Sequence, residues 1–358
     1  MAENLDFTKN LLDWNAVENS RPMPWKGEKD PYKIWLSEII LQQTRVEQGW
    51  SYYEKFIEAY PTVKQLAKAP EKKIFKLWEG LGYYSRCRNL IDTARKIAKD
   101  FNGKFPDSFE EIKKLKGVGP YTASAIASFA FNLPHAVVDG NVERVLSRYF
   151  GVTAPVDISA GKKFYNSLAF ALLDKKNPGI YNQAMMDFGA VICKPQNPQC
   201  ANCVQSKDCM AFRHDWISLL PVKARSIVKK NRWFYYFIVE TNDGRVYIRK
   251  RDQKDIWKNL YEFVLWETGQ LIPQSQLLSS KFTIDFFRKI KYSAGPISKV
   301  YRQQLTHQTI HGQFIYLRLQ KPLAPSDGYI LVEKDQLQDY PFPKLINEHL
   351  QNPVQQLF

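Results

Sequence analysis

The cysteine cluster between positions 193 and 209 limits what this chain can fold into more than any other feature of its sequence. Four of its five cysteines, Cys193, Cys200, Cys203 and Cys209, form the pattern Cys-x6-Cys-x2-Cys-x5-Cys. Four thiols this close together in a reducing compartment indicate metal ligands before they indicate disulfides. Zinc sites usually pair two short Cys-x2-4-Cys units and only one occurs here, so the spacing favours a [4Fe–4S] cluster over a zinc ion. The isolated Cys87 is expected to be a small buried apolar side chain.

Composition and charge narrow the class of protein. Hydrophobic residues make up 44% of the chain, which is enough for packed cores, and no apolar run reaches the length of about 18 residues that crosses a bilayer. The N-terminus lacks the basic and apolar stretches of a signal peptide, so we expect a cytoplasmic protein with no membrane partner. A net charge of +15 together with 14% aromatic residues suggests a nucleic acid as partner, because cations attract phosphates and rings stack on bases.

Residues 1–215 are expected to form a helical domain. Asp30 can cap a first helix and Pro31 suits its first turn. Apolar residues follow this start at helical spacing, at 34, 35, 39 and 41. Similar periodicity, with Gly, Pro or Asn between the segments, predicts helices around 62–78, 86–101, 108–116, 120–131, 141–149 and 160–173. The following stretch is basic, with four Lys or Arg and no acid between 221 and 230, and we interpret 216–230 as an exposed linker.

Residues 231–358 are expected to form a second domain of α+β type. The run 232–240 is rich in β-formers, 241–244 is a turn sequence, and 245–249 alternates polar with apolar residues, which together predict a β-hairpin. A further strand is predicted at 313–319. The chain as a whole is therefore expected to be mostly α, with an α+β domain at its C-terminal end.

The run Leu115–Ala123 predicts a tight turn between two helices. Gly117 and Gly119 allow close backbone approach, and Pro120 suits the first turn of the next helix. Free N–H groups at such a helix start make a phosphate site. An ordinary helix–helix turn would look the same.

Two carboxylates stand out by their surroundings. Asn141 can cap a helix, which places Asp139 just before a helix N-terminus, where a carboxylate is kept ionised. Glu38 lies in a helical segment among apolar neighbours, a setting that raises the pKa of a carboxyl and makes it a plausible acid. Taken singly, a turn Asp beside Gly140 and a half-exposed helix Glu remain equally simple interpretations.

These motifs together resemble the helix–hairpin–helix DNA glycosylases with an iron–sulfur loop. Within that group the chain resembles the adenine DNA glycosylases of the MutY family, which remove adenine mispaired with 8-oxoguanine, and the resemblance extends over essentially the whole chain. It implies a helix–hairpin–helix catalytic domain, a C-terminal Nudix-like domain and a [4Fe–4S] cluster. Besides the cysteines, its most specific stretches are 22–25, 35–46, 80–86, 115–123, 138–145 and 182–189.

The resemblance implies roles for matching residues. Glu38 corresponds to the acid that protonates adenine N7, and Asp139 to the carboxylate that stabilises the positively charged sugar, two opposed tasks as in glycoside hydrolysis. Tyr121 and Asn141 correspond to residues that support the sugar and the attacking water. Glycosylases that also nick DNA carry Lys at position 121, where it forms a Schiff base, so Tyr predicts a monofunctional enzyme.

The remaining roles concern the substrate. The resemblance implies duplex DNA with A:8-oxoguanine or A:G mispairs as partner and a monomeric protein, acting at the nucleoid if the source is bacterial. The extruded adenine would lie against Arg21, Lys26 and Gln183. The residues expected to wedge into the duplex and contact the oxidised guanine are Leu41, Gln43 and Tyr83. Gly117 and Gly119 would bind the phosphate backbone of the DNA.

The sequence departs from the family pattern at two places. Lys26 stands where the family usually has Arg, which keeps the charge but loses the planar fork. Leu305-Thr306-His307 stands where the family reads 8-oxoguanine with Phe-Ser-His, so Thr306 and His307 keep the polar groups. The second domain also lacks the spaced glutamates of a Nudix hydrolase, so we expect it to recognise a lesion without hydrolysing nucleotides.

Two other interpretations remain open. A lyase-type glycosylase resembling endonuclease III would share the hairpin, Asp139 and the cysteines, but it would need Lys at position 121. A non-catalytic, metal-stabilised DNA-binding protein would need only the charge, the hairpin and the cluster, and it would leave Glu38 and Gln183 without a task.

Overall fold

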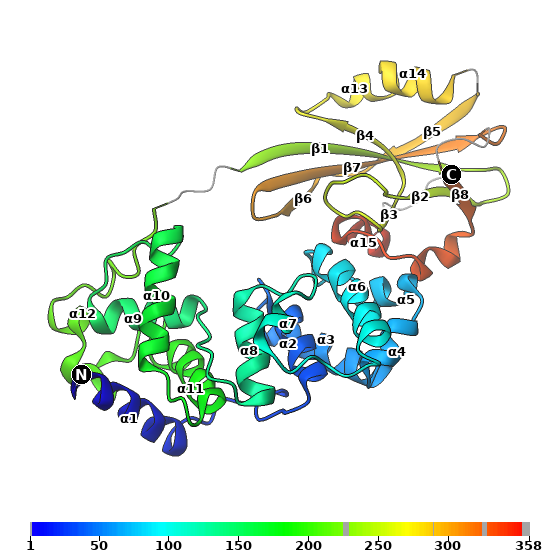
Figure 1. Cartoon of the computed structure of the whole chain (residues 1–358). Helices are drawn as coiled ribbons and strands as arrows, with labels where there is room; N and C mark the ends of the chain where they lie inside the picture. The colour runs from blue at the N-terminus through cyan, green and yellow to red at the C-terminus, as the bar shows by residue number, and fades with distance from the viewer. Residues whose placement is uncertain (1, 225–228, 289, 324–327, 353–358) are drawn as a thin grey trace. The chain divides into compact units, whose positions relative to one another are not determined.

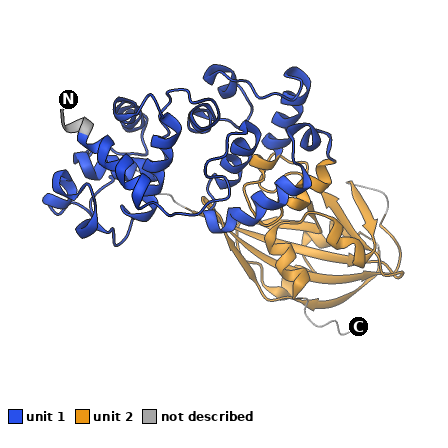
Figure 2. Ribbon diagram, turned by 90° about the horizontal axis from the view of Figure 1, so that it is seen from below, with its two compact units in different colours: residues 1–69, 88–226 blue, residues 70–87, 227–358 orange. Residues whose placement is uncertain are grey.

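The computed structural model describes residues 2–224, 229–288, 290–323 and 328–352. The chain divides into two compact units, one made of Met1–Ala69 with Arg88–Ser226 and the other of Pro70–Cys87 with Ile227–Phe358 (Figure 2). The segment Pro70–Cys87 thus groups with the C-terminal residues, although no local pattern in the sequence indicates this. The limits 1–215, 216–230 and 231–358 stay a prediction, and residues 225–228 of the proposed linker lie outside the described residues.

The first unit is helical throughout its described length, which confirms the predicted class (Figure 1). Asp30 caps α2 by accepting from the Tyr32 N–H at 2.9 Å, with Pro31 in the first turn, as predicted. The helices are α1 (Ala2–Val17), α2 (Pro31–Leu41), α3 (Val46–Ala59), α4 (Val63–Lys68), α6 (Ser85–Asp100), α7 (Phe109–Lys113), α8 (Pro120–Phe131), α9 (Gly140–Phe150), α10 (Ser159–Leu172), α11 (Pro178–Val191) and α12 (Met210–Arg213), with 3-10 turns η1 (Cys200–Asn202) and η2 (Ser206–Asp208).

The single helix predicted over 62–78 is wrong, because the chain breaks at Pro70. Residues 63–68 form α4, Ala69 is extended, and Pro70 precedes the next helix, α5 (Glu71–Leu77). A proline disfavours helical geometry at the residue before it, so the apolar periodicity continues across a boundary that the backbone does not.

One apolar core joins α1, α9, α10 and α11 and extends to the cysteine loop. Phe7, Leu11 and Trp14 of α1 pack with buried side chains of α9, α10 and α11, and the Trp14 ring meets Phe188 edge to face with centroids 5.0 Å apart. Cys193, Cys203 and Cys209 border the same core. The rigid body that carries α9 and α11 therefore also supports the loop of cysteines.

The second unit contains a mixed sheet in which β1 (Lys230–Glu240) and β7 (Gln308–Leu319) pair in parallel at the centre. The predicted hairpin is confirmed, with Glu240 opposite Val246, and the predicted strand 313–319 lies within β7. The other strands are β2 (Val246–Lys250), β3 (Tyr261–Glu262), β4 (Val264–Thr268), β5 (Tyr292–Ile297), β6 (Tyr301–Gln304) and β8 (Tyr329–Val332), and the helical segments are α13 (Gln274–Leu277), α14 (Lys281–Phe287), η3 (Lys334–Asp339) and α15 (Lys344–Gln351).

Helices cover both faces of this sheet (Figure 1). On one face, Phe237 of β1 packs against Phe282 and Phe287 of α14. On the other, His349 of α15 stacks on Phe314 of β7 with ring centroids 3.8 Å apart. This α+β arrangement agrees with the predicted class. In the described part of the chain, none of the helices is long and apolar enough to cross a membrane.

Candidate active site and cysteine loop

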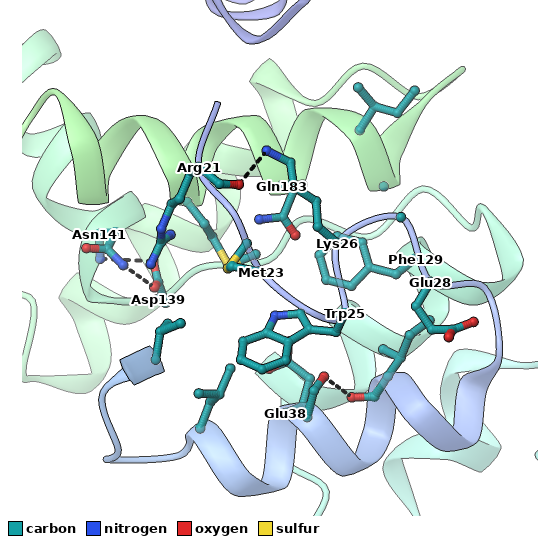
Figure 3. A pocket seen from close by; sticks show the side chains of 18 of the residues that line it. Arg21, Met23, Trp25, Lys26, Glu28, Glu38, Phe129, Asp139, Asn141 and Gln183 are labelled. Atoms are coloured by element: carbon teal, nitrogen blue, oxygen red, sulfur yellow. Dashed lines mark hydrogen bonds between the residues drawn. The ribbon is translucent and has the colours of Figure 1, made fainter. Parts of the chain in front are cut away.

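A pocket of about 370 Å³ in the first unit brings most of the predicted site residues together. Its walls come from the segment before α2, from α2 and α11, and from the starts of α8 and α9. Figure 3 shows residues of all these elements facing one space. The predicted residues that line it are Arg21, Lys26, Glu38, Leu41, Tyr121, Asp139, Asn141 and Gln183.

Glu38 is the most strongly perturbed acid of this pocket. It lies on the buried face of α2 with 7% of its surface exposed, so the expected apolar setting is confirmed. Burial raises the pKa of Glu38 to about 7. The Tyr121 hydroxyl opposes this rise, and the charge of nearby Asp139 contributes to it. A carboxyl with this pKa holds its proton in a large fraction of molecules at neutral pH.

Tyr121 connects the two acids. It stands in the first turn of α8. Its hydroxyl interacts with the Glu38 carboxyl and donates to the Met186 sulfur at 3.7 Å. Burial and the charges of Glu38 and Asp139 raise the pKa of Tyr121 well above its usual value. The hydroxyl therefore stays protonated beside the two acids.

Asp139, and not Asn141, is the N-cap of α9, which corrects the predicted cap. One Asp139 oxygen accepts from the backbone N–H groups of Asn141 and Val142, both at 2.9 Å, and the other accepts from the Asn141 amide at 2.7 Å. Asp and Asn are both good caps, and the helix begins one residue earlier than expected, at Gly140. Burial outweighs these bonds and raises the pKa of Asp139, whereas the cap position alone predicts a lowered one.

Arg144 holds Asn141 in place and was not found from the sequence. Its guanidinium donates to the Asn141 side-chain oxygen at 2.8 Å, to the Gly189 carbonyl at 2.7 Å and to the Cys193 carbonyl at 2.7 Å. The Asn141 amide is thereby turned so that its N–H₂ faces Asp139. Only 8% of the Arg144 surface is exposed. The signal in the sequence was a basic residue on the apolar side of an amphipathic helix.

The four clustered cysteines line a small cavity of about 30 Å³ beyond the other end of α9. Arg148 donates to the Lys194 carbonyl at 2.7 Å and approaches the Cys193 sulfur at 3.5 Å. Burial raises the pKa of the Cys203 thiol to about 12, so thiolates in this cavity need a cationic centre. This donor set fits a metal centre. Within the described residues, no three His, Cys, Asp or Glu side chains gather closely enough to hold one ion.

The tight turn predicted at 115–123, between two helices, has the expected backbone geometry. Gly117 has φ +78°, and a Cβ there would lie 2.7 Å from the Asn89 side chain. Gly119 precedes α8 and provides no side-chain cap for the N–H groups of its first turn. A Cβ on Gly119 would meet nothing within 4 Å, so the helix start is open to a ligand.

The other predicted DNA-contacting residues lie outside the pocket. Gln43 is exposed with φ +60°, and Tyr83 is 45% exposed with φ +48°. Thr306 and His307 form the turn between β6 and β7, and His307 is exposed. Within the second unit, the hydroxyl groups of Tyr83 and Thr306 share a hydrogen bond, so two of the residues expected to contact the oxidised guanine do meet.

Asp187 is a further buried acid that the sequence analysis did not single out. It is fully buried in α11 and contacts Arg21, Lys26 and Gln183, three residues that line the pocket. Its position between Met186 and Phe188 was a usable signal, because a carboxylate among apolar neighbours on a helix needs partners.

Two family models match the chain. Residues 36–164 match the HhH-GPD superfamily of base excision DNA repair proteins, and residues 235–352 match the NUDIX domain. The adenine DNA glycosylase of Buchnera aphidicola subsp. Baizongia pistaciae is 34% identical over 325 residues, which cover 88% of this chain and 87% of that protein. The adenine DNA glycosylase of Homo sapiens is 40% identical over 220 residues, 59% of this chain and 40% of the human protein.

Solved structures resemble a little over half of the chain. A thermostable thymine-DNA glycosylase superposes with a TM-score of 0.55 at 31% identity, covering 59% of this chain and 97% of that one. An endonuclease III–DNA complex superposes with a TM-score of 0.51 at 22% identity over the same share of this chain and 97% of its own, which shows the fold alone.

Proposed function

The chain belongs to the adenine DNA glycosylases, hydrolases of N-glycosyl bonds in base excision repair, and we propose that its substrate is adenine mispaired with 8-oxoguanine or guanine in duplex DNA. The protein acts as a monomer on genomic DNA, in the nucleoid if the source is bacterial. A base inside the duplex cannot be attacked at its glycosidic bond, so the adenine is extruded into the pocket of about 370 Å³.

Glu38 protonates N7 of the extruded adenine. The observation that carries this step is the pKa of Glu38, which burial raises to about 7 in the pocket that also holds Asp139. A proton on N7 lets the base leave as a neutral molecule, which lowers the barrier to breaking the bond to C1′. Tyr121 keeps the Glu38 carboxyl oriented through its hydroxyl.

Asp139 stabilises the positive charge that grows on the sugar as the base leaves, directly or as a transient covalent partner. Three hydrogen bonds fix its oxygens, so little reorganisation is needed in the transition state. Asn141 holds the carboxylate and supports the water that attacks C1′. The two acids thus have opposed tasks, because one must be protonated and the other ionised.

The reaction ends at the abasic site. A phenol has no amine and forms no Schiff base with the sugar, so Tyr121 supports a monofunctional glycosylase. We expect no strong adduct that borohydride can trap.

Cys193, Cys200, Cys203 and Cys209 hold a [4Fe–4S] cluster in this proposal. Four thiols around one cavity, with the sequence spacing Cys-x6-Cys-x2-Cys-x5-Cys, support such a centre. Bound there, such a cluster supplies the cationic centre that four thiolates need. Arg144 and Arg148 connect the cysteine loop to α9, so an ordered loop supports the helix that Asp139 caps.

Recognition of the opposite base falls to Leu41, which lines the pocket, and to residues outside it. Leu41, Gln43 and Tyr83 wedge into the duplex, Thr306 and His307 contact the oxidised guanine, and the backbone at Gly117 and Gly119 binds phosphate at the start of α8. In the second unit, the buried Glu262 forms ion pairs with Arg249 and Arg251, which leaves its carboxylate unsuited to bind a metal ion. This supports recognition without nucleotide hydrolysis.

A glycosylase assay tests the proposal. Duplexes carrying A opposite 8-oxoguanine, A opposite guanine, or thymine glycol are incubated with the enzyme and then treated with alkali. We expect strand cleavage only after alkali and only on the first two duplexes. Cleavage of the thymine glycol duplex without alkali would instead identify a lyase of the endonuclease III type.

A further inference from the structure

Asp187 is the most heavily bonded acid beside the pocket, yet it does not line it. Its carboxylate is completely buried and accepts from the Arg21 guanidinium at 2.9 Å, the Asn19 amide at 2.9 Å and the Gln183 amide at 3.0 Å, with the Lys26 ammonium at 3.2 Å. Four donors around one buried carboxylate form a fixed arrangement, because losing any of them would leave a buried charge poorly satisfied.

This arrangement decides which way the Gln183 side chain faces. An ionised carboxylate between two cations accepts hydrogen bonds and donates none, so the Gln183 atom that it contacts must be Nε2. The other end of the amide, Oε1, is then turned away from Asp187. Among the described residues no donor bonds to this oxygen, and Gln183 is a half-buried residue of the pocket wall (Figure 3).

Lys26 belongs to the same arrangement. Its ammonium bonds both Asp187 and the Arg21 carbonyl, the latter at 3.3 Å. A Lys in place of the family's usual Arg thus remains anchored by the buried carboxylate, although it offers no planar fork to a base.

We propose that Asp187 is a positioning residue that makes Gln183 present an acceptor to the pocket, so that the pocket selects a purine with a donor at position 6. Adenine carries an amino group there, whereas hypoxanthine and guanine carry a carbonyl oxygen that Oε1 repels. The proposal deepens the proposed function, on which it rests. A buried site built to pair one hydrogen-bonding group rejects analogues that lack it far more strongly than a hydrophobic pocket rejects a missing methylene.

The test compares release of adenine and of hypoxanthine, each opposite 8-oxoguanine, under single-turnover conditions. The wild-type enzyme should release adenine faster. Asp187→Asn frees the Gln183 amide to turn its N–H₂ toward O6, so the ratio of the two rates should fall by about tenfold or more. An unchanged ratio, even with both rates reduced equally, would make Asp187 a merely structural residue and would overturn the proposal.

A swapped pair provides the rescue. In the double variant Gln183→Glu with Asp187→Asn, the amide introduced at position 187 donates to the carboxylate introduced at position 183. That carboxylate again presents an acceptor to the pocket, and the total charge is conserved. The adenine preference should return to within about threefold of the wild-type ratio. A swapped enzyme that still lacks the preference would overturn the proposal, and this variant decides the question if Asp187→Asn does not fold.

A matched control and the wild-type enzyme separate the possible failures. Asp13→Asn removes an exposed carboxylate that pairs with Lys9, and it should leave the ratio unchanged. A shift as large as that of Asp187→Asn would refute the assignment to Asp187. A wild-type enzyme that releases neither base would contradict the proposed function itself, whereas one that prefers adenine leaves the variants to judge Asp187.

Discussion

Glu38 and Glu262 are both nearly fully buried glutamates, one in each compact unit, with opposite surroundings. Glu38, 7% exposed, has a neutral hydroxyl from Tyr121 beside it and another carboxylate close by, and burial raises its pKa to about 7. Glu262, 1% exposed, is bonded by the Arg249 and Arg251 guanidinium groups. A buried carboxyl without a cation becomes an acid, and one between cations becomes a structural ion pair.

The different surroundings of Glu38 and Glu262 indicate different roles for the two units. The first unit places a perturbed acid, Asp139 and an open pocket together, which is what bond cleavage requires. The second unit uses its buried carboxylate to stabilise the sheet, where β2 carries Arg249 and β3 carries Glu262. The contrast predicts that isosteric Glu→Gln changes at the two sites have unlike consequences.

The largest effect is expected at Asp139. Asp139→Asn keeps the shape of the N-cap but removes the negative charge that faces the sugar, so adenine release should fall by at least about a thousandfold. Duplex binding should remain close to that of the wild-type protein, as measured by fluorescence anisotropy. Full activity in this variant would refute the role of Asp139.

The next effect concerns stability in the second unit. Glu262→Gln removes the counter-ion of the half-buried Arg249 and leaves the buried Arg251 with Asp255 at 3.3 Å, so the free energy of unfolding should drop by about 3–5 kcal/mol. Chemical denaturation measures this, with Asp243→Asn as an exposed control that also removes a partner of an arginine. An equal loss in both variants would show that the buried pair contributes no more than a surface pair.

Glu38→Gln should change stability in the opposite direction. The pKa of Glu38 in the folded protein is about 7, above its ordinary value of 4.5, so its stabilising contribution is complete below 4.5 and is lost as pH rises through about 7. A glutamine has no charge to bury and no such loss. At a pH of about 8, denaturation of the variant should therefore require about 1–3 kcal/mol more than that of the wild type. A destabilised variant at that pH would indicate that a cation neutralises Glu38.

Local structural settings could be predicted from the sequence more readily than the contacts that position the candidate site residues. Glu38 among apolar neighbours and the tight turn at Gly117 follow from local pattern, and both are confirmed. The roles assigned to these residues stay predictions. Asn141 was misplaced as the cap, because Asp and Asn are almost equally good caps on either side of Gly140.

The supporting contacts could not be read from local pattern. Arg21 and Asp187 are 166 positions apart, and Arg144 reaches the Cys193 carbonyl across 49 positions. Contacts of this kind depend on how α9 and α11 pack, which periodicity does not specify. The grouping of Pro70–Cys87 with the C-terminal residues is long-range in the same sense, since the Phe342 N–H bonds Glu79 at 2.8 Å.

The pH dependence of adenine release tests the central claim most directly, namely that Glu38 acts as the acid. Single-turnover rates are measured on an A:8-oxoguanine duplex from a pH of about 5 to about 9. The account predicts a rate that falls as pH rises through about 7, where Glu38 loses its proton, and a loss of this limb in Glu38→Gln. A wild-type rate that stays constant across that range would contradict it.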